Sequence, residues 1–249
     1  MRIVAIGDIH LYRLWLRPWD LLSKRALGAL NLWLNRRHRF SLLDTPRLVE
    51  RVAEIGPDRI LCTGDLTTTA LNTEYRDAAA LCEELNAIAP LFVVPGNHDR
   101  YTFRASRTRR FENALGEMTA TAWPHHLALD DRTAVIGLDP TRPNVVTDRG
   151  RVGPGQLASL ADRLNSLPAD HRVIVVCHYP LATPRGRRVE PERHALIDRT
   201  QLIRCLADAG RPTLYLHGHI HEPWCFRVPG TPNVTAVDLG ATIMTDAEH

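Results

Sequence analysis

Five short polar motifs constrain the fold of this 249-residue chain more than any other feature, because most of them directly follow an apolar run. Nearly continuous apolar runs of four or five residues are typical of strands that are covered on both faces. In open α/β sheets, ligands bind beyond the carboxyl ends of such strands, so we expect these motifs to converge. In chain order they are Asp8-Ile9-His10, Gly64-Asp65, Gly96-Asn97-His98-Asp99, the single residue His178 and Gly218-His219-Ile220-His221.

The apolar runs alternate with amphipathic segments, which predicts an α/β fold. We expect strands at 2–6, 59–62, 91–94, 134–138, 173–177 and 213–216, and helices at 45–55, 74–88, 155–167 and 199–209. The pattern changes after Gly218, where β-rich runs at 224–228 and 234–239 flank a Pro-Gly turn and predict an antiparallel pair. The sequence therefore predicts either one mixed sheet or two sheets packed face to face.

Length and cysteine usage limit the class of protein. The chain fits one α/β domain, or at most two small ones, and we expect a single domain over 1–249. Its five cysteines are odd in number and form no C-x-x-C pair, which disfavours a disulfide framework and favours a reducing cytoplasm. The N-terminal apolar run is too short for a signal peptide, and no apolar stretch is long enough to predict a membrane-spanning helix.

The donor types in the motifs indicate a transition-metal site. Carboxylate, amide and imidazole groups together suit Mn, Fe, Co or Zn rather than Ca or Mg. The motifs supply more donors than one tetrahedral ion needs, so we expect two divalent ions, with manganese first among the candidates. The seven candidate ligands are Asp8, His10, Asp65, Asn97, His178, His219 and His221.

The spacing within the motifs supports this interpretation. Asp8 and His10 are two residues apart, so an extended backbone would turn both side chains to one face. Glycine precedes the other multi-residue motifs and lets the backbone turn closely at a strand end. His217 precedes the last motif, and we expect it to pack beside the ligands rather than bind an ion. Five further histidines match no such context and receive no role: His125, His126, His171, His194 and His249.

All five motifs, from Asp8 to His221, resemble those of the calcineurin-like metallophosphoesterase superfamily: D-x-H, G-D, G-N-H-D/E, H and G-H-x-H. The resemblance implies two mixed β-sheets packed as a sandwich flanked by helices, with a dinuclear metal centre at the strand ends. It also implies that Asp65 bridges the two ions. By the same resemblance, Asp8, His10 and His221 hold one ion, and Asn97, His178 and His219 hold the other.

The resemblance gives His98 a catalytic role beside the ions, without ligating them. A hydroxide that bridges the ions would attack the phosphorus, and His98 would bind the phosphoryl oxygen or protonate the leaving alkoxide. Asp99 is a weaker candidate for orienting the His98 ring. We therefore expect His98→Ala to keep both metals and lose most turnover, and Asp65→Ala to lose metal as well.

Residues 11–40 form a basic insert with three of the five tryptophans and seven basic residues against one acid. Apolar side chains recur there at helical spacing, which predicts a helical cap over about 11–44. Basic and aromatic side chains around an apolar stripe also suit a lid or a peripheral contact with the inner face of a membrane. The arginine-rich loop at 185–188 offers further charge for a phosphate-rich substrate, although a solvated loop is an equally good interpretation.

The favoured function is a metal-dependent phosphohydrolase that cleaves phosphodiester or pyrophosphate bonds in small-molecule or lipid-linked substrates. Within the superfamily the chain looks like the bacterial cyclic-nucleotide and glycerophosphodiester phosphodiesterases. The insert keeps open a lipid pyrophosphatase of the type that cleaves UDP-2,3-diacylglucosamine at a membrane surface. A non-catalytic scaffold is disfavoured because every ligand of the motifs is present. A net charge of +3 is a weak footprint for nucleic acid.

Overall fold

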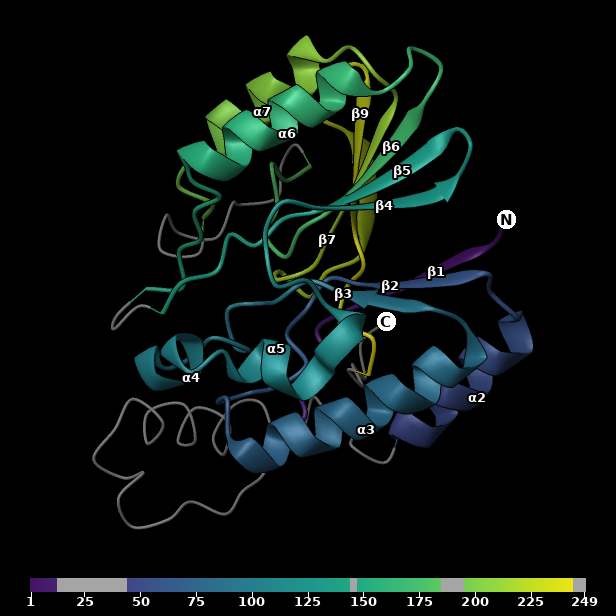
Figure 1. Ribbon diagram of the computed structural model, residues 1–249, viewed down its shortest axis with the longest axis vertical. Helices are drawn as coiled ribbons and strands as arrows, with labels where there is room; N and C mark the ends of the chain where they lie inside the picture. The colour runs from purple at the N-terminus through teal and green to yellow at the C-terminus, as the bar shows by residue number, and fades with distance from the viewer. Residues whose placement is uncertain (13–43, 144–146, 185–194, 244–249) are drawn as a thin grey trace.

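The computed structural model describes residues 1–12, 44–143, 147–184 and 195–243. Two β-sheets pack face to face within these residues, and helices cover the outer face of each sheet (Figure 1). The predicted two-sheet sandwich is thereby confirmed. The predicted helical insert and the arginine-rich loop at 185–188 lie almost entirely outside the described residues.

The smaller sheet carries the first three motifs. Its strands are β1 (Ile3–Ile6), β2 (Arg59–Cys62) and β3 (Leu91–Val93), paired in that order and parallel throughout. The helices α2 (Thr45–Ile55) and α3 (Asn72–Ile88) precede β2 and β3. Parallel strands bring their carboxyl ends to one edge, so the segments that follow β1, β2 and β3 lie together.

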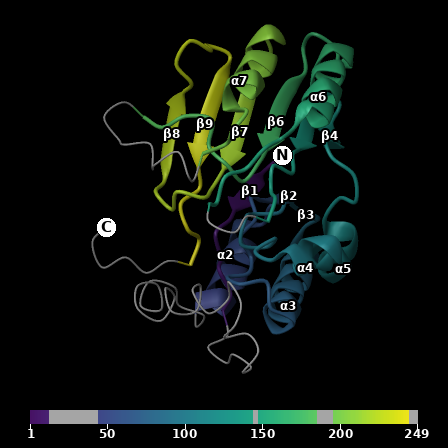
Figure 2. The ribbon, with the colours of Figure 1, turned by 90° about the vertical axis from the view of Figure 1, so that its left-hand side faces the viewer.

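The larger sheet is mixed and carries the last two motifs. Its strand order is β4-β5-β6-β7-β9-β8, in which the outer pairs β4–β5 and β8–β9 are antiparallel and the inner pairs parallel. Figure 2 shows these strands side by side, with α6 and α7 on one face. The elements are β4 (His125–Asp130), β5 (Thr133–Gly137), α6 (Pro154–Ser166), β6 (Arg172–Val176), α7 (Arg199–Asp208), β7 (Thr213–His217), β8 (Trp224–Arg227) and β9 (Val234–Asp238).

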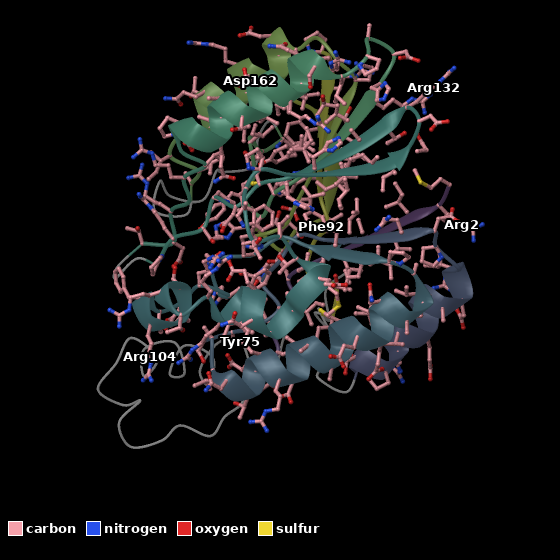
Figure 3. The ribbon with its side chains drawn as sticks, viewed as in Figure 1. Arg2, Tyr75, Phe92, Arg104, Arg132 and Asp162 are labelled. Atoms are coloured by element: carbon pink, nitrogen blue, oxygen red, sulfur yellow. The ribbon has the colours of Figure 1, made fainter. Side chains whose placement is uncertain are left out.

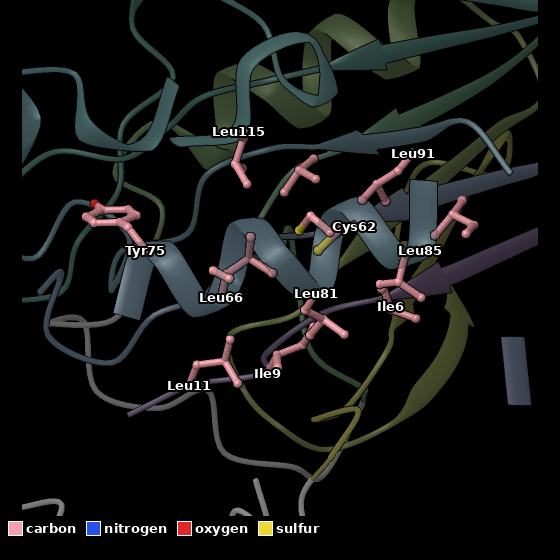
Figure 4. Close-up of a cluster of buried hydrophobic side chains, with 14 of the residues drawn as sticks. Ile6, Ile9, Leu11, Cys62, Leu66, Tyr75, Leu81, Leu85, Leu91 and Leu115 are labelled. Atoms are coloured by element: carbon pink, nitrogen blue, oxygen red, sulfur yellow. The ribbon is translucent and has the colours of Figure 1, made fainter. Parts of the chain in front are cut away.

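Three apolar layers hold the sandwich together, because alternate residues of a buried strand face opposite sides. In β2, Ile60 and Cys62 face the layer shared with α2 and α3, whereas Leu61 faces the layer between the sheets. Figure 4 shows the first of these layers, where side chains of α3 such as Leu81 and Leu85 meet those of the smaller sheet. The third layer lies between the larger sheet and the helices α6 and α7.

Most predicted elements form within one or two residues of their expected ends. The helix α2 has proline in its first turn and ends at Gly56, whose φ of 60° is the left-handed cap that glycine favours. The predicted antiparallel pair after Gly218 forms as β8 and β9. The start of α3 is earlier than expected, at Asn72, because the Glu74 carboxylate accepts hydrogen bonds from the Thr69 and Leu71 backbone amides ahead of the helix.

One strand and the short helices that follow the third motif were not predicted from the sequence. The strand β4 pairs with β5 through a tight turn, but it is half-buried and begins with two histidines rather than an apolar run. The missed helices are α4 (Phe103–Arg107), α5 (Arg110–Leu115) and a 3₁₀ turn at Gly116–Met118, which are too short to show an apolar period. Within the described part of the chain, no helix has the length and apolar content needed to cross a membrane.

Candidate metal centre

The five motifs meet where the carboxyl ends of the two sheets come together. Backbone hydrogen bonds join them: the Asp8 amide donates to the Gly64 carbonyl at 2.9 Å, and the Gly218 amide donates to the His178 carbonyl at 3.1 Å. The amide of His219 donates to both carboxylate oxygens of Asp8, at 3.1 and 3.2 Å. The last motif on the larger sheet is therefore fixed to the first motif on the smaller one.

One cluster of donor atoms combines Asp8, His10 and His221. The Nε2 atoms of His10 and His221 lie 3.0 Å apart. Oδ1 of Asp8 is 3.2 Å from Nε2 of His221 and 3.7 Å from Nε2 of His10. Two imidazoles and a carboxylate thus aim their donor atoms at one small volume, as the ligands of an ion do.

A second cluster combines Asp65, His178 and His219 with the amide of Asn97. Oδ1 of Asn97 lies 2.9 Å from both His178 Nε2 and His219 Nδ1. His178 Nε2 is also 3.2 Å from Asp65 Oδ2. The other nitrogen of His178, Nδ1, lies 2.9 Å from the Thr63 carbonyl and donates to it, so Nε2 is the nitrogen that faces Asn97 and Asp65. An ion bound here would take the place of a proton on Nε2.

Asp65 belongs to both clusters. Its Oδ2 atom lies 3.6 Å from His10 Nε2 in the first cluster and 3.2 Å from His178 Nε2 in the second. Its Oδ1 atom accepts a hydrogen bond of 2.8 Å from the His98 amide, which fixes the carboxylate. A carboxylate in this position can bind two ions at once. The structure therefore brings all seven candidate ligands together around a shared oxygen, and this donor set fits two divalent cations.

The backbone reaches this arrangement by left-handed turns. Five of the seven non-glycine residues with positive φ in the described chain are candidate ligands: Asp8, His10, Asp65, His219 and His221. The expected extended geometry of Asp8 and His10 is wrong, since their φ values are 51° and 52°. Such conformations cost free energy and persist where the surrounding structure enforces them, commonly at functional sites.

Two glycines let the clusters close. A Cβ atom on Gly96 would lie 2.0 Å from Asp65 Oδ1, and one on Gly218 would lie 1.8 Å from Asp8 Oδ2. No side chain fits at either position without displacing a carboxylate. The glycines of these two motifs are therefore required by close approach of the backbone to the site.

Both cluster carboxylates are buried and ionised. Burial disfavours the charged form of Asp8, but hydrogen bonds with His10 and His221 hold its pKa well below its usual range. Burial likewise opposes ionisation of Asp65, and the charges of His178 and His98 outweigh it, so its pKa is also lowered. Two negative charges are thus held out of water within one site.

Burial and the two carboxylates shift the pKa values of the cluster histidines in two directions. Burial lowers the pKa of His10 and of His219 to about 3, so both are neutral, which is the form that binds metal ions. Burial also acts against His178, but the charge of Asp65 and its hydrogen bond raise the pKa of His178 to about 9. The Asp65 carboxylate therefore stabilises positive charge next to it, whether that charge is a proton on His178 or a bound cation.

His98 lies beside the clusters, with one ring nitrogen within 4.8 Å of donor atoms of His10 and Asp65. Its Nδ1 is 2.6 Å from the Thr68 carbonyl, and Tyr101 stacks on the ring with centroids 5.6 Å apart. The Thr68 carbonyl thus has the orienting role that was suggested for Asp99. The Asp99 carboxylate instead accepts hydrogen bonds of 2.9 Å from the backbone amides of Thr67 and Gly96, and so shapes the turn.

Tyr179 links the second cluster to the connection after β5, and the sequence analysis did not identify it. Its buried ring packs on His219 with centroids 4.5 Å apart, and its hydroxyl donates to the Asp148 carbonyl at 2.5 Å. The Asp198 carboxylate holds the same connection by accepting the amides of Val152 and Gly153 at 3.1 and 2.7 Å. The only sequence signal for Tyr179 is its position next to His178.

A second buried charge network lies directly after the third motif. The Arg100 guanidinium donates to Glu112 at 2.7 Å, to Asp139 at 2.8 Å and to the Thr141 hydroxyl at 3.0 Å. The side chains of Arg100 and Glu112 are each 8% exposed. The network joins α5, on the smaller sheet, to the segment after β5, on the larger one. His217 is also buried, with Nδ1 3.2 Å from Asp238, which agrees with the packing role expected for it.

The geometry of the site agrees with the comparisons of sequence. The family model of the calcineurin-like phosphoesterases matches residues 1–223, and the chain belongs to this family. A probable cyclic nucleotide phosphodiesterase of Pseudoalteromonas sp. is 26% identical over 72% of this chain and 61% of its own length. A probable glycerophosphodiester phosphodiesterase of Arcobacter nitrofigilis is 28% identical over 67% of this chain and 57% of its own length. The chain thus spans about three-fifths of these curated relatives.

Solved structures share the fold. A dimetal phosphatase from Danio rerio superposes with a TM-score of 0.67 over 98% of this chain and 88% of its own, at 15% identity. A purple acid phosphatase from yellow lupin seeds gives a TM-score of 0.63 over 100% of this chain and 46% of its own, at 14% identity. The fold and the donor set together indicate a divalent metal centre at the strand ends.

Proposed function

We propose that the protein is a dinuclear-metal-dependent phosphohydrolase that cleaves phosphodiester bonds. In this proposal Asp8, His10 and His221 hold one ion, Asn97, His178 and His219 hold the other, and Asp65 binds both. The observation that carries it is the convergence of carboxylate, amide and imidazole groups on both sides of Asp65 Oδ2, in two sets that share this one oxygen.

The proposed chemistry needs an activated water and a stabilised phosphoryl group. The two ions would lower the pKa of a water and neutralise charge on the phosphoryl oxygens. His98 is held by the Thr68 carbonyl and by Tyr101, so its position is set before substrate arrives. With the proton on Nδ1 directed at that carbonyl, Nε2 faces the site, and a second proton on Nε2 of the imidazolium would be the one donated to the leaving oxygen.

Manganese is the proposed ion at both positions. The donors are two carboxylates, one amide oxygen and four imidazoles, a mixture that suits first-row transition ions, with iron, zinc and cobalt as alternatives. With Asp65 counted at both positions, each ion would have four protein donors, and an ion of higher coordination number would keep room for water and substrate.

A small-molecule phosphodiester is the proposed substrate class. The names of the two curated relatives, a cyclic nucleotide phosphodiesterase and a glycerophosphodiester phosphodiesterase, both favour it. The lipid pyrophosphatase alternative and the membrane contact of residues 11–40 stay predictions, because the insert lies outside the described residues. The single domain over 1–249 and the cytoplasmic location also stay predictions.

The test is a substrate panel on the full chain, first stripped of metal and then reloaded with manganese. The panel contains a phosphomonoester, an aryl phosphodiester, a cyclic nucleotide, a glycerophosphodiester and a UDP-linked lipid. We expect diester hydrolysis only in the reloaded protein. Binding of manganese without turnover of any substrate contradicts the proposed activity, whereas failure to bind manganese contradicts the site itself. Preference for the UDP-linked lipid would select the pyrophosphatase alternative.

A further inference from the structure

A basic, aromatic segment follows the third motif and takes no part in the proposed chemistry. Residues 100–111 contain five arginines and no acidic residue. Arg100 is buried in the network described above, but Phe103, Arg104, Arg107 and Arg109 are exposed. The segment begins beside the metal centre, since Tyr101 stacks on His98. We call these four exposed residues the α4 patch.

The geometry of α4 places most of the patch on one face. Phe103 and Arg107 are four residues apart and Arg104 and Arg107 three, so all three side chains share one side of the helix. Ala105 lies on the opposite side and is buried, and the Thr102 hydroxyl caps the helix by accepting the Ala105 amide at 3.1 Å. The buried face fixes the orientation in which the patch is presented to solvent.

Within the described residues, no carboxylate forms an ion pair with the three arginines of the patch. The buried and surface pairs of Arg47, Arg51, Arg100 and Arg132 involve other parts of the chain. The Arg109 guanidinium donates to a backbone carbonyl, that of Thr121, at 3.0 Å. Three positive charges on a short exposed segment therefore face solvent together.

Phe103 is unusual in the same place. Its side chain is 62% exposed, and it is the only aromatic residue among the exposed large hydrophobic residues of the described chain. An aromatic ring surrounded by guanidinium groups matches the interface of an anionic bilayer, where the ring lies at headgroup level and the arginines meet lipid phosphates. Exposed arginines alone are ordinary on a protein surface, and it is the exposed ring beside them that favours a bilayer.

We propose that the α4 patch is a docking surface for an anionic phospholipid bilayer. Charge complementarity selects an anionic partner, and the single exposed ring selects a bilayer over a nucleic acid. Single-stranded nucleic acids are bound by several aromatic side chains along a charged groove, whereas the patch offers one exposed ring on one short helix. The proposal does not rest on hydrolase activity, because binding alone tests it, but docking here would bring the metal centre to the membrane surface.

The test is sedimentation of the full chain with phosphatidylcholine vesicles, with and without about one-third phosphatidylglycerol. We expect binding only to the anionic vesicles, and a loss of binding at high salt. Each arginine removed should weaken partitioning about fivefold, so Arg104→Glu/Arg107→Glu should weaken it by more than about tenfold. Phe103→Ser should weaken it by a smaller factor.

The matched control is Arg132→Glu/Arg172→Glu, which makes the same change in net charge at exposed positions. Figure 3 shows Arg104 and Arg132 at opposite ends of the molecule. We expect this control to bind as the wild type does. Should Arg104→Glu/Arg107→Glu lose its native circular dichroism, the neutral pair Arg104→Gln/Arg107→Gln takes its place.

Three results would overturn the proposal. The first is wild-type protein that ignores anionic vesicles. The second is equal binding by the patch variant and the control, whether both are retained or both lost, since either would leave the patch without a specific role. The third is patch-dependent binding of an oligonucleotide in place of vesicles, which would assign the surface to nucleic acid.

Discussion

The metal centre and the Arg100 network both take charged groups out of water, but only the network contains a permanently charged cation. Around Arg100, a guanidinium with five donors meets the carboxylates of Glu112 and Asp139 and one hydroxyl. In the two clusters of the metal centre, carboxylate, amide and imidazole atoms face one another at 2.9 to 3.7 Å. Their positive charge can come only from protons on the imidazoles or from bound cations. Buried carboxylates therefore indicate a metal site where they face imidazoles, and a structural ion pair where they face a guanidinium.

The largest expected effect comes from removing the shared carboxylate. Asp65→Ala deletes the oxygen common to both clusters, so we expect loss of both ions and of all measurable metal-dependent turnover. In the wild type, manganese at on the order of 100 times its Kd should raise the free energy of unfolding by about 3 kcal/mol. That increase should vanish in the variant, as measured by urea unfolding and elemental analysis.

His98→Ala sharpens this test, because in the proposed site His98 is not a ligand of either ion. We expect both ions to remain and turnover to fall by about 10²–10⁴-fold, the usual contribution of a general acid. The measurement is kcat at saturating manganese alongside metal content. Metal loss equal to that of Asp65→Ala would instead make His98 a ligand, and unchanged kcat would remove its catalytic role.

Disruption of the Arg100 network should lower stability without removing the metal ions. Arg100→Met leaves Glu112 and Asp139 buried without their partner, which should lower the free energy of unfolding by about 3–5 kcal/mol. We expect the folded fraction to keep its manganese, because Arg100, Glu112 and Asp139 are not among the proposed ligands. Urea unfolding and metal content measure the two effects separately.

The matched control for Arg100→Met is Arg51→Met. Arg51 pairs with Glu54 at 2.7 Å on the surface, where the side chains are 73% and 64% exposed. Removal of this pair should cost under about 1 kcal/mol, because solvent screens it. Equal losses in the two variants would mean that burial does not distinguish the pairs, and loss of manganese from folded Arg100→Met would couple the network to the metal centre.

The same contrast explains what could be predicted from the sequence. Each motif carries its donors within four residues at a strand end, so local spacing and strand parallelism are enough to bring Asp8, Asp65 and Asn97 together at one edge of the smaller sheet. Arg100, Glu112 and Asp139 come from three segments that share no local pattern, and their meeting depends on how the two sheets pack. The Thr68 carbonyl that orients His98 is a backbone group, which no side-chain pattern reveals.

Local conformation was harder to predict than position. The spacing of Asp8 and His10 correctly indicated a common target, but the extended backbone assumed for it was wrong, because both residues are left-handed. Left-handed φ is rare outside glycine, so sequence rules do not anticipate it at aspartate and histidine. The helix α4 was missed for a different reason: five residues are too few to show an apolar period, although Thr102 is a good N-cap.

The smallest expected effect comes from Tyr179, the neutral residue that connects His219 to Asp148. Tyr179→Phe removes the hydroxyl that donates to Asp148 and keeps the ring on His219, so manganese content should not change. Loss of one buried hydrogen bond should cost about 1 kcal/mol of stability. Since Asp148 lies in the connection beside the site, the KM for a diester should rise severalfold at unchanged kcat.

Tyr215→Phe is the control for this prediction, because its hydroxyl is equally buried and donates to the Tyr179 carbonyl at 2.8 Å. It should lose similar stability, since a neutral donor is removed from a buried acceptor in both variants. Its KM should stay at the wild-type value, because the bond joins β7 to the Tyr179 backbone and holds no segment of the connection after β5. Equal KM values in the two variants would show that the Tyr179 hydroxyl serves packing alone, and that the Asp198 carboxylate is enough to hold residues 152–153 in place.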